Sequence, residues 1–149
     1  MGRWLAAILR DDIGLRDQMA RYVPTDDAGL PADENAVVAE LCSLAAGRYF
    51  GFGYDVGTVT EFARWMRGLW VGRYPLGVIQ IEGVIRAALG ETEVDLSGIE
   101  RPAVTKAQVV TASHISRIMK WDLSTVEQLV REAETGAARR GWNPRPAVA

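Results

Sequence analysis

The chain has 149 residues and a formal net charge of −2, with 48% hydrophobic and 24% charged residues. This composition is typical of one ordinary folded domain and excludes wholesale disorder. No apolar run reaches the ~18 residues that a membrane-spanning helix needs, so we expect a cytoplasmic protein with no membrane partner. The single cysteine, Cys42, cannot form an internal disulfide.

Charge is distributed unevenly along the chain. Residues 1–100 carry 9 basic and 15 acidic side chains, a balance of −6, whereas residues 101–149 carry 8 basic and 4 acidic ones, a balance of +4. The two parts could attract one another, or the second could face an anionic partner. Only Lys106 and Lys120 among the 17 basic residues are lysines, which indicates the codon bias of a high-GC bacterium.

Helical periodicity begins near the N-terminus. Apolar residues recur at helical spacing over Arg3–Tyr22, and Pro24–Ala32 has the composition of a loop. Asp33 is placed to cap the next helix, which we expect over Glu34–Tyr49. Its buried stripe is predicted to be Val37, Val38, Leu41, Leu44 and Ala45.

An aromatic and glycine-rich loop follows at Phe50–Gly57. Thr58–Glu61 has the pattern of a capping box, which predicts a helix that runs to about Val71. That helix is expected to bury Val59, Phe62, Met66, Leu69 and Trp70. After a turn at Gly72–Pro75, a further helix is predicted over Leu76–Leu89, ended by Gly90. Within it, Val78–Ile81 could instead form a short strand, and Glu82 and Arg86 are spaced for an ion pair.

The C-terminal third is predicted to form two more helices. Glu91–Arg101 is loop-like, and capping boxes at Thr105–Gln108 and Ser124–Glu127 open helices that reach about Lys120 and Gly141. The first should bury Val109, Ala112, Ile115, Ile118 and Met119, and the second Val126, Leu129, Val130 and Ala133. The fold class is therefore all-α: a single compact bundle of about six helices with short capped turns, a domain over residues 1–141 and a tail over 142–149.

The residues that chemistry would need are scarce. Besides Cys42, the chain has one histidine, His114, so the usual zinc and haem patterns are absent, and Cys42 has no obvious activator. The Gly51-x-Gly53 run has Val56 where a dinucleotide fingerprint needs its third glycine. We therefore expect no catalytic residue, no metal, no cofactor and no enzymatic activity. Because the chain has 19 acidic residues, an enzyme or small-ligand binder that uses buried carboxylates stays open as a third class.

Aromatic residues and arginines are concentrated between residues 49 and 74. Flat aromatic side chains and guanidinium groups are typical anchors of protein interfaces, because they bury a large area at a low entropic cost. The leading hypothesis is a non-catalytic helical adaptor or structural subunit that binds another protein or itself. Its predicted partner-binding residues are Phe52, Tyr54, Trp65, Arg73 and Trp142.

The segment 114–130 suggests an alternative. Ile115, Ser116 and Met119, then a turn, then Ser124 opening a second helix, locally resemble the helix-turn-helix of bacterial transcription regulators. This resemblance implies a DNA-binding regulator that uses residues 106–140, whose positive charge suits nucleic acid. Its major-groove residues would be Thr125, Gln128 and Arg131, and its phosphate-contacting residues Arg117 and Lys120.

Overall fold

A computed structural model describes residues 32–69 and 76–141. The predicted helical region Arg3–Tyr22, the Gly72–Pro75 turn and the 142–149 tail lie outside these residues. The helices in the described ranges are α3 (Ala32–Phe50), α4 (Val56–Leu69), α5 (Val78–Ala88), α6 (Arg101–Ile118) and α7 (Leu123–Arg139).

The all-α fold class is confirmed, and no strand occurs in the described part of the chain. The residues Val78–Ile81, for which a strand was the alternative, form the first turn of α5. Across residues 32–69 and 76–141, no helix combines the length and apolar character that crossing a bilayer demands.

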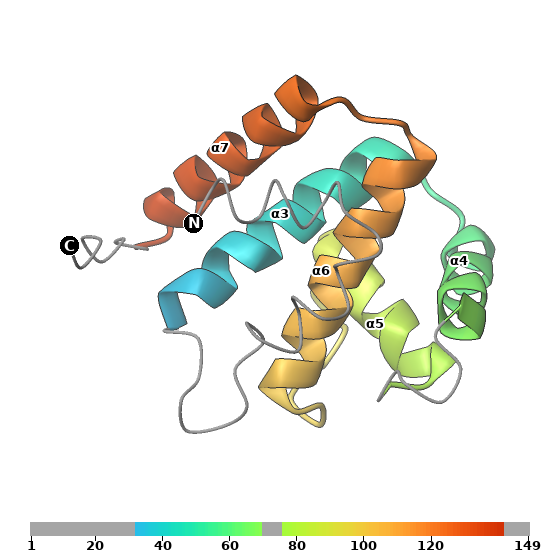
Figure 1. Ribbon diagram of the computed structural model, residues 1–149. Coiled ribbons are helices and arrows are strands. Elements are labelled where there is room, and N and C mark those ends of the chain that lie inside the picture. Colours follow the sequence, from blue (N-terminus) through green and yellow to red (C-terminus); the bar gives the residue numbers. More distant parts are fainter. Residues whose placement is uncertain (1–31, 70–75, 142–149) are drawn as a thin grey trace.

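Helix α3 is the centre of the arrangement. It packs against α5, α6 and α7, while α4 packs mainly against α5. Figure 1 shows α7 on one side of α3, with α6 crossing α3 and with α4 and α5 on the other side. The predicted stripe of α3 explains its central place, since Val37, Val38, Leu41 and Ala45 are buried.

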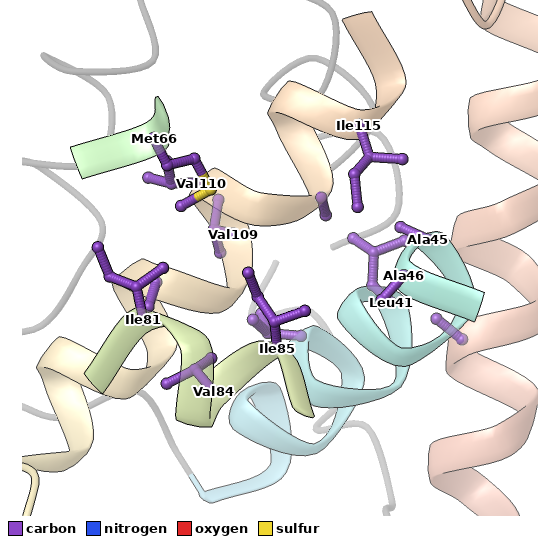
Figure 2. Packing of buried hydrophobic residues seen from close by; sticks show 14 of the residues in the cluster. Leu41, Ala45, Ala46, Met66, Ile81, Val84, Ile85, Val109, Val110 and Ile115 are labelled. Carbon is purple, nitrogen blue, oxygen red and sulfur yellow. The ribbon is translucent and has the colours of Figure 1, made fainter. Parts of the chain in front are cut away.

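The core cluster draws buried side chains from α3, α4, α5, α6 and α7. Figure 2 shows the part of it that lies among α3, α4, α5 and α6. Small residues Ala45 and Ala46 let α3 approach its neighbours, and Ile81 and Ile85 of α5 fill the space beside α6. Because such interiors are close-packed, this cluster holds the helices in one relative arrangement.

The three capping boxes predicted the wrong first residue for α4, α6 and α7, because each of these helices begins earlier in the chain. At α4, the backbone amide of Gly57 donates to Asp55 Oδ1 at 3.1 Å, so that the helix starts before Thr58. Helix α6 begins at Arg101 with Pro102 in its first turn, which leaves Thr105 buried inside the helix. At α7, Asp122 accepts a hydrogen bond from the amide of Thr125 at 2.8 Å. An earlier residue that suits a helix start displaced the pattern in each case.

Three side chains that periodicity assigned to the core are exposed. They are Leu69, at 53% exposure, together with Ile118 and Met119. Leu69 and Ile118 are the last residues of α4 and α6, and Met119 follows directly. Helical spacing continues to the end of a helix, but a neighbouring helix need not extend as far.

A charged network ties α5 to the loop that follows it. Arg86 pairs with Glu82 at 3.4 Å, as the spacing predicted, and it also pairs with Glu91. The hydrogen bond from Arg86 to the Glu91 carboxyl lowers the pKa of Glu91, with a smaller contribution from the Tyr54 hydroxyl. Glu91 therefore holds the end of α5 near the loop before α4.

The ion pair between Arg86 and Glu91 should make the free energy of unfolding depend on pH. Because the pKa of Glu91 is lowered in the folded state, the carboxylate stabilises the fold above its usual pKa of 4.5, and this contribution is lost as pH falls through the folded value. We expect Glu91→Gln to be less stable than the natural chain at neutral pH. The difference should shrink as the solution is acidified to about pH 3, measured by urea unfolding. A difference that stays constant with pH would contradict the assignment.

Candidate protein-binding surface

A row of aromatic rings runs from the end of α3 across α4. Tyr49 and Phe50 both lie within 5.5 Å of Phe62, measured between ring centroids, and Phe62 lies 5.5 Å from Trp65. Phe62 is buried, whereas Tyr49 is partly exposed and Trp65 is 43% exposed. The outer rings therefore rest on a packed inner ring, which limits their freedom to rearrange.

The apolar surface continues from α4 onto α6. The Trp65 ring contacts the His114 ring edge-on, with centroids 5.2 Å apart. Ile118 lies one helical turn beyond His114, and Leu69 lies one turn beyond Trp65. Ile118 and Leu69 are both exposed. We use the name aromatic surface for five exposed apolar residues: Tyr49, Trp65, Leu69, Ile118 and Met119.

Buried contacts fix the helices under this surface. The hydroxyl of Thr111 on α6 donates to the sulfur of Met66 on α4 at 3.7 Å, and both residues are buried. The underlying layer belongs to the main core cluster. The hydrogen bond from Thr111 to Met66 thus joins α4 and α6 beneath the part of the aromatic surface that these two helices carry.

Phe52 is presented at the tip of the loop between α3 and α4. It lies between Gly51 and Gly53, whose φ angles of 73° and 72° are in the left-handed region that glycine tolerates best. The amide of Gly51 donates to the carbonyl of Gly47 at 3.0 Å, which ends α3 in a defined way. The Phe52 side chain is fully exposed. The backbone conformation of Gly51 and Gly53 therefore places the Phe52 ring in solvent.

The other predicted partner-binding residues are placed differently. Tyr54 is half-buried, packs against the core cluster and bonds to Glu91, and the pKa of its hydroxyl is raised mainly by burial. Arg73 and Trp142 lie outside the described residues. The structure therefore exposes Phe52 and Trp65 and assigns Tyr54 a mainly structural contact.

The residues of the DNA-binding alternative lie on α6, α7 and the turn between them. Arg117, Lys120, Gln128 and Arg131 are exposed, and Thr125 is half-buried. Lys120 has a φ of 52°, so a side chain occupies a left-handed turn position. Gln128 Nε2 donates to Glu132 at 3.3 Å, which places a carboxylate beside the proposed reading residues.

A groove runs along the line where α3 and α7 pack together. It has a volume of about 460 Å³ and is lined by Glu40, Leu44, Gln128, Arg131, Glu132, Thr135, Gly136 and Arg139. Glu40 has only 12% of its side chain exposed, and Arg140 Nη1 lies 2.8 Å from its Oε1, though without the alignment of a hydrogen bond. At the other end, Arg48 pairs with Glu132 at 3.2 Å.

The single cysteine and the single histidine of the chain are both buried. Cys42 is buried, and burial raises the pKa of its thiol to about 12, which keeps it protonated and unreactive. His114 is buried beside Trp65. Within residues 32–69 and 76–141, no three histidine, cysteine or acidic side chains gather where they could hold a metal ion.

The groove and the exposed ends of α4 and α6 were not predicted from the sequence. One signal was present: Gly136 lies inside a helix, where an isolated glycine often marks a close approach. A Cβ at this position would lie 2.9 Å from Glu40 Oε2, so Gly136 makes room for the Glu40 side chain. The exposed ends of α4 and α6 had no comparable signal.

Comparison of the chain with protein-family models, with curated protein sequences and with solved structures finds no match in any of the three.

Proposed function

We propose that the chain is a non-catalytic helical subunit that binds another protein through Phe52 and the aromatic surface, in the cytoplasm. The observation that carries this proposal is the fully exposed Phe52 ring, held between two glycines with positive φ. Trp65, exposed on the neighbouring helix, supplies a second anchor.

The energetics favour such a use of these residues. Burying one large apolar side chain yields about 1.5–3 kcal/mol, and a few aromatic anchors commonly dominate an interface. Phe52 retains nearly all of this potential gain because it is fully exposed in the folded chain. Trp65 rests on Phe62 and His114, so little side-chain freedom remains to be lost on binding.

Site-specific photo-crosslinking in native cells tests the proposal. A photoreactive phenylalanine analogue at position 52 should give a discrete crosslinked product, whose mass distinguishes a second copy from a different protein. Trp65→Ala should lower the yield of that product at least several-fold, with circular dichroism confirming that the variant is folded. The matched control places the same analogue at Ile79, which is 83% exposed on α5. Equal crosslinking from positions 52 and 79 would overturn the proposal.

A DNA gel shift separates this proposal from the DNA-binding alternative. A regulator that acts through residues 106–140 should bind duplex DNA without sequence preference at low salt, because phosphate contacts are strongest there. We expect no shift. Binding at low salt that is lost in Arg117→Ala/Lys120→Ala would instead support the alternative and contradict a protein-only role.

A further inference from the structure

Two arginines line the α3–α7 groove without an acidic partner in the described residues. Arg131 and Arg139 are exposed and are two turns apart on α7, a rise of about 12 Å. The groove's two carboxylates already have cations: Glu40 lies next to Arg140, and Glu132 pairs with Arg48. The groove therefore retains an excess of positive charge that suits an anionic occupant.

The loop between α5 and α6 carries the opposite charge. Glu93 and Glu100 are exposed, and neither makes an ion pair or hydrogen bond with a side chain in residues 32–69 and 76–141. Glu91 pairs with Arg86, and Asp95 Oδ1 accepts a hydrogen bond from the amide of Ser97. Glu93 and Glu100 are thus the carboxylates of this loop that are free to meet a cation.

This loop cannot reach the groove of its own molecule. Val94 and Leu96 pack over Gly83 of α5, and Ile99 packs against the core. The loop is therefore held between the end of α5 and the start of α6. Figure 1 shows α7 on the opposite side of α3 from α5. The groove and the loop therefore lie at different parts of the described structure, and the loop of a second copy could bring carboxylates to the groove.

We propose that the chain associates with copies of itself head to tail, with the 91–100 loop of one copy against the α3–α7 groove of the next. Glu93 and Glu100 would approach Arg131 and Arg139. The contact uses different surfaces on the two molecules, so that it can propagate instead of closing as a symmetric dimer. It involves neither Phe52 nor Trp65 and is independent of the proposed protein-binding surface.

Light scattering after size exclusion tests the proposal. At about 20 mM salt, the weight-average mass should rise with concentration from 16.3 kDa to at least twice that value, and it should return to 16.3 kDa at about 0.5 M salt. Association through the aromatic surface would instead persist at high salt. A chain that remains at 16.3 kDa at low salt and high concentration would overturn the proposal.

Charge reversal identifies the contact. Arg131→Glu/Arg139→Glu and Glu93→Lys/Glu100→Lys should each abolish the rise in mass, and mixing the two variants should restore it. Arg64→Glu/Arg67→Glu makes the same change in net charge as Arg131→Glu/Arg139→Glu, but on α4, and should leave association intact. Circular dichroism checks that each variant folds. If the mixture fails to associate, or if the α4 control also abolishes association, then the assigned contact is wrong and the self-association arises elsewhere.

Discussion

Replacing Ile85 with alanine should lower the free energy of unfolding by about 2–5 kcal/mol. Ile85 has no solvent exposure and lies in the cluster that joins α5 to α3 and α6. Truncation removes apolar contacts and leaves a cavity that a close-packed interior fills only in part. Urea unfolding monitored by circular dichroism measures the loss directly.

Ile79→Ala is the matched control for this experiment. It makes the same chemical change in the same helix, but Ile79 is 83% exposed. We expect the control to change stability by no more than about 0.5 kcal/mol. Similar losses from both substitutions would mean that α5 presents a different face to the core from the one described.

Replacing Asp122 with alanine should lower the free energy of unfolding by about 1 kcal/mol. The Asp122 carboxylate accepts the hydrogen bond from the Thr125 amide that begins α7. Without it, an amide at the helix start loses its partner, and a favourable negative charge is lost from the positive end of the helix dipole. Thermal unfolding should show a lower midpoint.

Ser124→Ala separates the observed cap from the one that the sequence pattern indicated. Ser124 lies in the first turn of α7 and is exposed, so that we expect its loss to have little effect on the melting temperature. A larger loss from Ser124→Ala than from Asp122→Ala would contradict the observed start of α7 and favour the capping box.

The two surfaces differ in how they should respond to salt. Phe52 and the aromatic surface are apolar, so binding there should depend weakly on ionic strength or strengthen with it. The α3–α7 groove and the 91–100 loop would attract through exposed charges, which salt screens within about 10 Å at 0.1 M. A salt titration can therefore separate the two interactions even when both contribute to assembly.

Helical periodicity in the sequence correctly predicted which residues are buried in the middles of the helices. Helical spacing correctly placed buried residues on three helices: Val37, Val38 and Leu41 on α3, Val59, Phe62 and Met66 on α4, and Val126, Leu129 and Val130 on α7. Gly90, with a φ of 94°, follows the end of α5 as expected. These features follow from the sequence because periodicity and backbone freedom are properties of adjacent residues.

The same periodicity did not predict the first residues of the helices or the exposed residues at their ends. Several residues near each start can act as a cap, so the pattern at Thr58 did not exclude the earlier Asp55. Leu69 and Ile118 continue their buried stripes, yet both are exposed as the last residues of α4 and α6. Whether such a residue is covered depends on the length and angle of another helix.

The sequence by itself determined the all-helical class and the buried positions in the middles of the helices. Only the tertiary structure decided that Trp65 meets His114, and that Arg131 and Arg139 line a groove opposite the acidic loop. The reason is physical: helix formation and burial follow from spacing along one segment, whereas a surface is assembled from segments far apart in the chain. Their meeting depends on how the helices pack.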